Sequence, residues 1–329
     1  MFNNNEWLNQ VTEVVIDPER EIVDPHHHLW PPGPLRYDLP ELLADTDGGH
    51  NVTQTVFIEC GASYLNDGPE HLRCVGETRY VAAAAETSKL HSEKATIAGI
   101  VAHADLRSDS LEEILDAHEE AAGGLLKGIR HQAASDSTPD LAIPAPATPK
   151  LLMCEDFRRG ITQLGERQLS FDAWIYHHQL PELIELAKAI PTTTIVLDHF
   201  GTPLGVGPYE TKKSEIFKQW KKDVIQLAEL PNTYAKLGGL AMPDNGYGWH
   251  TQAMPPSSDE IVASQRHYYD FTIECFGPSR CMFESNFPVD RLSLGYRVLW
   301  NAFKKMTASF SDSEKDKLFS GVARRVYRL

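Results

Sequence analysis

Basic residues are scarce in this 329-residue sequence, which has 31 Lys and Arg against 46 Asp and Glu and a formal net charge of −15 at pH 7. Contacts to phosphate groups require clustered Lys and Arg, so this imbalance argues against a nucleic-acid or anionic-membrane partner. No apolar run reaches the roughly 18 residues that a membrane span needs. The segment Met1–Glu6 also lacks the basic start and apolar core of a signal peptide.

Cysteines are few, scattered and odd in number. None of the five stands in a Cys-x-x-Cys pair, which is typical of reduced, mostly buried thiols. Cys60 follows an apolar segment, but no nucleophile motif surrounds it, so we interpret it as a buried thiol. We therefore expect a cytoplasmic protein with neither a nucleic-acid nor a membrane partner. A homo-oligomer is left open.

A Gly-x-Gly-x-x-Gly motif after an early strand is also missing, which argues against a dinucleotide-binding open sheet, the runner-up fold. Eight apolar segments are present instead, separated by helical patterns and without a linker-like break. They are residues 22–28, 52–60, 97–103, 125–131, 170–178, 193–201, 234–240 and 281–286. This alternation predicts an α/β fold, a single (β/α)8 TIM barrel with long βα loops, over residues 1–329, with 1–21 as a lead-in segment.

The first apolar segment carries a His-x-His pattern. Alternate side chains of a strand share a face, so Asp24, His26 and His28 should point one way and His27 the other. His26 and His28 are therefore spaced to bind one divalent metal ion. A lone His-x-His is weak evidence, since surface histidine clusters are common.

Further polar residues stand at the carboxyl ends of the predicted strands, where the active sites of such barrels lie. These are Glu59, His103, Arg130, His131, His177, His178, His199, Lys236, Glu284 and Asn286. Any single histidine, His103 or His131 above all, is as well explained as a hydrogen-bonded, half-buried side chain. The whole set predicts a metal-centred pocket, because imidazoles and carboxylates are the ligands that zinc selects.

Five motifs carry a resemblance to a known family: Asp-Pro-His-His-His-Leu-Trp (24–30), Gly-Ile-Arg-His (128–131), Tyr-His-His-Gln-Leu-Pro (176–181), Leu-Asp-His-Phe-Gly (197–201) and Phe-Glu-Ser-Asn-Phe-Pro-Val-Asp (283–290). The chain resembles the amidohydrolase superfamily, in its amidohydrolase-related branch of metal-dependent TIM-barrel hydrolases. That branch contains sugar-lactone hydrolases, 4-sulfomuconolactone hydrolase and 2-pyrone-4,6-dicarboxylate lactonase. The resemblance implies a lactonase-like hydrolase with a divalent metal, zinc or manganese, although some lactonases of the branch are thought to work without one.

The resemblance also implies a ligand set. It makes His26 and His28 metal ligands from strand one and His199 a ligand from strand six. The strand-five ligand is His177 or His178. Strand alternation favours His178, whereas the form of the Tyr-His-x-Gln-Leu-Pro motif favours His177, which we take as the expected ligand.

Strand eight departs from the family pattern. Asn286 stands where many members have an aspartate, and an amide cannot serve as a general base. Glu284 on the same face, or Asp290 in the following loop, is then the expected proton carrier. The alternative for Glu284 is an ion pair with Arg130 inside the barrel mouth.

The resulting hypothesis is that a metal-activated water opens a lactone or a related carbonyl substrate. Arg130, with His131, Lys236 or His250, would bind a substrate carboxylate. Trp249 would cover the substrate from a glycine-containing lid, or else pack on Pro255 and Pro256 in an ordinary loop. The alternatives are a metal-dependent decarboxylase of an aromatic or muconate-type acid, and a non-catalytic binding barrel.

Overall fold

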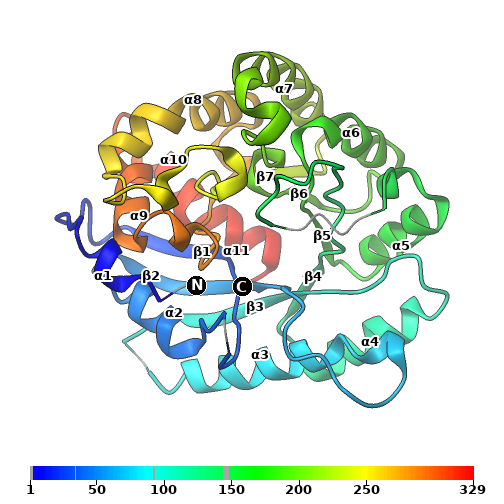
Figure 1. The fold of residues 1–329 in the computed structure, drawn as a ribbon. Helices are drawn as coiled ribbons and strands as arrows, with labels where there is room; N and C mark the ends of the chain where they lie inside the picture. Colours follow the sequence, from blue (N-terminus) through cyan, green and yellow to red (C-terminus); the bar gives the residue numbers. More distant parts are fainter. Residues whose placement is uncertain (1–2, 34, 92, 144–147) are drawn as a thin grey trace.

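Eight parallel strands, paired in chain order from β1 to β8, form a nearly closed barrel (Figure 1). The computed structural model describes residues 3–33, 35–91, 93–143 and 148–329. The strands are β1 (Glu21–His27), β2 (Asn51–Ile58), β3 (Thr96–Ala102), β4 (Leu126–Ile129), β5 (Ser170–Ala173), β6 (Ile195–Leu197), β7 (Thr233–Leu237) and β8 (Cys281–Phe283). The His28 amide donates to the Phe287 carbonyl at 2.8 Å and joins the ends of β1 and β8. The predicted (β/α)8 barrel is confirmed.

Helices follow the strands and surround them (Figure 1). They are α1 (Asn5–Leu8), α2 (Leu39–Thr46), α3 (Val75–Ser88), α4 (Leu111–Ala122), α5 (Glu155–Glu166), α6 (Leu180–Ala189), α7 (Lys213–Ala228), α8 (Ser258–Phe276), α9 (Tyr296–Met306), α10 (Asp312–Asp316) and α11 (Val322–Tyr327). No helix in the described ranges is long and apolar enough to cross a membrane.

The fifth strand is shorter than expected, ending at Ala173 instead of His178. The side chain of Gln179 explains the early end. Its oxygen accepts hydrogen bonds from the amides of Tyr176 and Ser135, and its nitrogen donates to the Ala133 carbonyl at 2.9 Å. These bonds hold His177–Gln179 in a 3-10 turn and place both histidines beyond the strand.

Helix α11, red in Figure 1, packs against β1 and β8. Val322, Val326 and Tyr327 join the apolar cluster inside the barrel. Arg324 pairs with Glu21, the first residue of β1, so α11 covers the amino-terminal end of the strands. The core is therefore completed by the last residues of the chain, opposite the strand ends that carry the polar residues.

The Tyr327 hydroxyl donates a hydrogen bond of 2.6 Å to the buried Asp172 carboxylate. We expect Tyr327→Phe to lower the free energy of unfolding by about 1–3 kcal/mol, because it removes one donor from a buried acceptor. Urea denaturation measures the loss. Tyr234→Phe is the matched control, since Tyr234 packs on the same cluster and its hydroxyl has no hydrogen bond to any described residue. Equal losses in both variants would contradict the assignment.

Candidate active site

The first strand presents its histidines to opposite sides. His27 packs edge-on against Phe57 with ring centroids 5.9 Å apart, whereas the His26 and His28 rings lie 4.9 Å from each other. The expected alternation is confirmed for the three histidines, but not for Asp24, which accepts a hydrogen bond from the Tyr296 hydroxyl of α9 at 2.9 Å. The pairing of β1 with β2 is irregular between Asp24 and His27, and this irregularity breaks the strand period. His28 Nδ1 lies 2.8 Å from the Ile58 carbonyl oxygen. Because a carbonyl only accepts, Nδ1 carries the proton and Nε2 keeps a lone pair.

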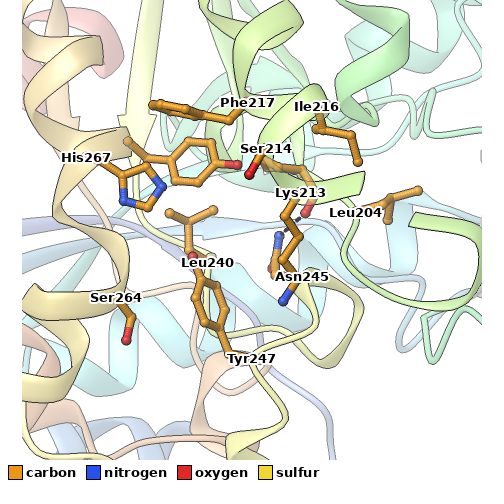
Figure 2. A pocket seen from close by; sticks show the side chains of 12 residues that line it. Leu204, Lys213, Ser214, Ile216, Phe217, Leu240, Asn245, Tyr247, Ser264 and His267 are labelled. Carbon is orange, nitrogen blue, oxygen red and sulfur yellow. Dashed lines mark hydrogen bonds between the residues drawn. The ribbon is translucent and has the colours of Figure 1, made fainter. Parts of the chain in front are cut away.

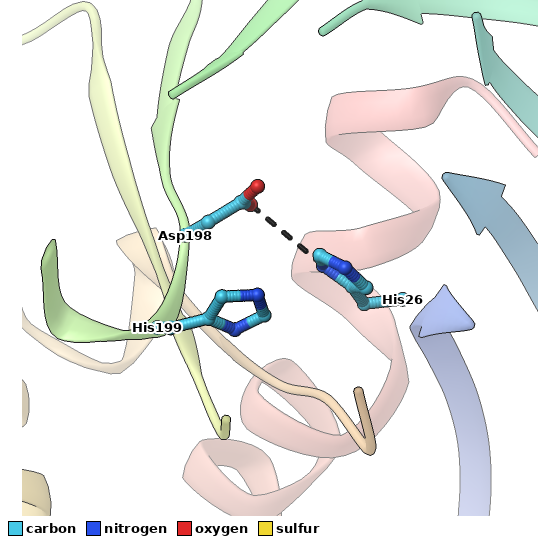
Figure 3. Close-up of side chains that lie close together, drawn as sticks. All are labelled: His26, Asp198 and His199. Carbon is cyan, nitrogen blue, oxygen red and sulfur yellow. Dashed lines mark ion pairs between the residues drawn. The ribbon is translucent and has the colours of Figure 1, made fainter. Parts of the chain in front are cut away.

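Three buried side chains, His26, Asp198 and His199, converge at the barrel mouth (Figure 3). One potential ligand atom of each lies within 4.8 Å of the other two. Asp198 and His199 directly follow β6, and the His26 and His199 ring centroids are 4.5 Å apart. Two imidazoles and a carboxylate are a donor set that suits a divalent transition metal or zinc.

The carboxylate of Asp198 has ion-pair contacts but no aligned hydrogen bond among the described residues. It is fully buried, and neither oxygen has a hydrogen bond within the described part of the chain. Lys236 Nζ lies 3.1 Å from Oδ1, and Arg130 Nη1 lies 3.6 Å from Oδ2. Burial disfavours the charge, but Lys236, His199 and Arg130 outweigh it and keep the pKa of Asp198 below its ordinary value. An ionised carboxylate without hydrogen bonds is rare and fits a bound cation.

Glu284 connects the two histidines of this group. Its Oε1 lies 2.6 Å from His199 Nδ1, and its Oε2 lies 2.8 Å from His26 Nδ1, an ion-pair distance without hydrogen-bond alignment. A carboxylate accepts, so His199 Nδ1 carries a proton and Nε2 is the ring nitrogen left for a metal ion. Carboxylates orient metal-binding or proton-accepting histidines in this way.

The two cations that lie next to Asp198 are already paired with other carboxylates. Arg130 Nε donates to Glu59 Oε1 at 2.7 Å, and Lys236 Nζ donates to Asp172 Oδ2 at 2.7 Å. Burial alone would lower the pKa of Arg130 and of Lys236, but the neighbouring carboxylates raise both above their ordinary values. Arg130 therefore pairs with Glu59, and Glu284 is left to the histidines.

At this end of the barrel the backbone takes conformations that residues other than glycine rarely adopt. His199 and Asn286 have φ values of 53° and 55°, a sign of strain that is common at functional sites. Next to them, Gly238 and Gly239 follow β7. A Cβ atom at Gly238 would collide with Glu284, and one at Gly239 would collide with the His199 ring. The glycine pair leaves the space in which Glu284 meets His199.

A hollow of about 280 Å³ opens beside these residues. We call it the catalytic cavity. It is lined by His28, Trp30, Cys60, Arg130, Gln132, Ile143, Trp174, His199, Met242, Asn286 and Val289. Four of the residues predicted from sequence, His28, Arg130, His199 and Asn286, thus share one cavity.

Other predicted residues lie elsewhere. His177 and His178 are outside the metal-binding group, and His177 Nδ1 accepts a hydrogen bond from the Leu204 amide at 3.3 Å. His131 Nδ1 likewise accepts from the Leu106 amide at 3.2 Å, and its ring packs on Phe157. His177 and His131 thus each accept a hydrogen bond from a backbone amide, which is a structural role.

The structure also shows where the loop residues predicted from the sequence lie. Trp249 is buried and stacks on Tyr247 at 4.8 Å instead of lining the catalytic cavity. Asp290 lies behind Asn286 and accepts hydrogen bonds from Asn286 Nδ2 at 2.9 Å and from the Ala241 amide at 3.2 Å. Burial raises the pKa of the Cys60 thiol, as expected for an unreactive cysteine.

Asp198 was assigned no role from the sequence, and Glu59 was placed only in the general set of strand-end residues. Asp198 immediately precedes His199 at the end of an apolar segment, and Glu59 ends another. The rule that picks out histidines at strand ends applies equally to these carboxylates, so the signal was present.

A separate hollow of about 220 Å³ lies beside α7 and α8, between Lys213, Phe217, Tyr247 and His267 (Figure 2). None of the residues predicted from sequence as catalytic, metal-binding or substrate-binding lines it. The candidate active site is therefore the catalytic cavity at the strand ends.

A family model described as amidohydrolase matches residues 23–329. The chain is 31% identical to the uncharacterised protein y4mH of Sinorhizobium fredii, over 94% of this chain and 98% of that protein. It is 28% identical to L-fucono-1,5-lactonase of Burkholderia multivorans, over 93% of this chain and 96% of the lactonase.

Solved structures share the fold. An amidohydrolase from Burkholderia multivorans with bound zinc matches with a TM-score of 0.72 at 24% identity, over 94% of this chain and 99% of that one. The 5-carboxyvanillate decarboxylase of Sphingomonas paucimobilis matches with a TM-score of 0.55 at 12% identity, over 94% and 99% of the two chains. At these identities the likeness concerns the fold alone.

Burial raises the pKa of Asp290 from an ordinary 3.8 to about 7. Between these values the folded chain binds a proton at Asp290 that the unfolded chain does not. The free energy of unfolding should therefore fall as the pH rises from about 4 to 7, by up to about 1.4 kcal/mol per pH unit. In Asp290→Asn this part of the pH dependence of the free energy of unfolding should be lost. Urea denaturation at several pH values between about 4 and 7 measures it. A constant difference between wild type and variant would contradict the assignment.

Proposed function

The chain belongs to the amidohydrolase family, and we propose that this amidohydrolase-type enzyme hydrolyses the ester bond of a lactone in the catalytic cavity. The observation that carries the proposal is the group at the cavity wall, where Glu284 holds two imidazoles beside the unsatisfied carboxylate of Asp198. The lactonases among the curated relatives support the substrate class.

We assign His26, Asp198 and His199 to a divalent metal ion, zinc by family resemblance and manganese as the alternative. The charges support a cation here. Four buried carboxyl groups, Glu59, Asp172, Asp198 and Glu284, surround only two buried cations, Arg130 and Lys236. A cation bound by these residues would polarise the lactone carbonyl and acidify a water molecule.

His28 is the imidazole of the cavity wall that lies outside this group. Its Nε2 lone pair is available, because Nδ1–H donates to the Ile58 carbonyl. Burial and Arg130 lower the pKa of His28 well below its ordinary value, so the ring is neutral near pH 7. We assign His28 Nε2 to take a proton from the attacking water and to return it to the alkoxide oxygen that leaves when the ring opens.

Arg130 and Glu284 assist this reaction in different ways. Arg130 Nη1 makes only long contacts, 3.5 Å to His26 Nε2 and 3.6 Å to Asp198 Oδ2. It can therefore donate to the lactone carbonyl oxygen, where negative charge develops. Glu284 is a positioning residue that fixes the His26 and His199 rings, and Asp290 does the same for Asn286.

A substrate carboxylate held by Arg130 and Lys236 is not part of this proposal, because both side chains are bound to buried carboxylates. His131 and Trp249 are likewise left out, since neither lines the cavity. The single domain, the cytoplasmic location and a homo-oligomer stay predictions.

The proposal is tested by the products formed. L-fucono-1,5-lactone and δ-valerolactone should release acid, read with a pH indicator, and no CO2. His28→Gln should lower kcat by about a hundredfold or more while the metal content stays unchanged. His178→Gln, at an exposed neighbouring histidine of the same barrel end, should leave both unchanged.

Two outcomes would overturn the proposal. Release of CO2 from aromatic or muconate-type acids, without lactone opening, would establish the decarboxylase. Metal-loaded protein that turns over neither class would establish the binding barrel.

A further inference from the structure

A second hollow, of about 750 Å³, adjoins the catalytic cavity, and we call it the antechamber. Trp30, Cys60, Ile143 and Val289 line both spaces. Because four residues line both spaces, the two hollows lie side by side. A substrate that fills only the catalytic cavity would leave the larger space unused.

The antechamber is more apolar than the group of buried charged residues beside the catalytic cavity. Its wall is built largely from apolar side chains, Trp7, Trp30, Leu35, Ile143, Pro243 and Leu292. None of its described lining residues is Asp, Glu, Lys or Arg. Its polar lining residues are Asn4, His250, Thr251 and Gln252. An alkyl or aryl group would bury surface against the two indoles.

The lead-in segment builds part of this wall. Trp7 lies in α1, and its Nε1 donates to the Gln252 carbonyl at 3.0 Å, in the segment between β7 and α8. Asn4 Nδ2 donates to the Arg291 carbonyl at 3.0 Å, after β8. The segment thus crosses two loops of the catalytic face. The family model begins only at residue 23, so Asn4 and Trp7 lie outside the matched region.

We propose that the substrate is a lactone bearing an apolar alkyl or aryl substituent, with its ring in the catalytic cavity and its substituent in the antechamber. Trp7 and Trp30 then determine specificity for the substituent. This inference rests on the proposed lactone hydrolysis. Trp7 keeps partly exposed ring surface and Leu35 is 37% exposed, so both have surface that such a group would cover.

The test compares δ-lactones with the same ring: δ-valerolactone without a substituent, δ-decalactone with a pentyl chain, and L-fucono-1,5-lactone with hydroxyl groups. Each buried methylene contributes about fourfold to binding. We therefore expect kcat/KM for δ-decalactone to exceed that for δ-valerolactone by at least about tenfold. Trp7→Ala should remove most of this preference by raising KM for δ-decalactone, with kcat little changed.

Two further variants control for general damage. Trp7→Phe should retain most of the preference, since an aromatic ring remains. Tyr64→Ala removes an aromatic side chain that is 37% exposed on the loop after β2 and should change neither constant. Equal kcat/KM for the two lactones, or equal losses on both in Trp7→Ala, would overturn the inference while lactone hydrolysis stands.

Binding of the corresponding lactams, 2-piperidone and 6-pentyl-2-piperidone, separates the two claims. If no lactone is hydrolysed, the proposed function fails. The antechamber assignment is then supported if calorimetry shows tighter binding of the pentyl lactam that Trp7→Ala abolishes. It is overturned if both lactams bind alike.

Discussion

The barrel mouth depends on one electrostatic constraint, an excess of buried carboxyl groups over buried cations. Lys236 pairs with Asp172 and Asp198, Arg130 pairs with Glu59, and Glu284 is left to the imidazoles of His26 and His199. Buried charges are tolerated only when they are paired. Asp198 is held by ion-pair contacts with Lys236 and Arg130 but by no aligned hydrogen bond among the described residues, and a bound cation would complete its coordination.

The surrounding structure holds this arrangement from several sides. Gly238 and Gly239 make room for Glu284 and the His199 ring, whereas Asp24 accepts a hydrogen bond from the Ser285 amide at 2.9 Å and fixes the turn after β8. At the other end of the barrel, Tyr327 holds Asp172, the partner of Lys236. His199 and Asn286 take left-handed backbone conformations within this packing.

Much of this arrangement follows from local sequence patterns. Alternating apolar and helical segments predicted the barrel, and the period of a strand placed His26 and His28 on one face. The same reasoning could not place His177, because the end of β5 depends on hydrogen bonds between Gln179 and residues 44 and 46 positions away. These contacts between distant segments are not visible in a local pattern.

Ion pairs between residues far apart in the sequence could not be predicted either. Sequence offered Arg130 and Lys236 as free cations, but their partners Glu59 and Asp172 come from other strands. The place of Trp7 could not be predicted for a similar reason. No local pattern in the lead-in segment indicates that this side chain lies beside Gln252. Such assignments depend on which strand ends meet, and only the closed barrel settles that.

Metal content tests the central claim most directly. Elemental analysis of the purified protein should find zinc or manganese, lost in Asp198→Asn and retained in His177→Ala, with both variants folded by circular dichroism. Metal that persists in Asp198→Asn, or that disappears in His177→Ala, would contradict the donor set of His26, Asp198 and His199.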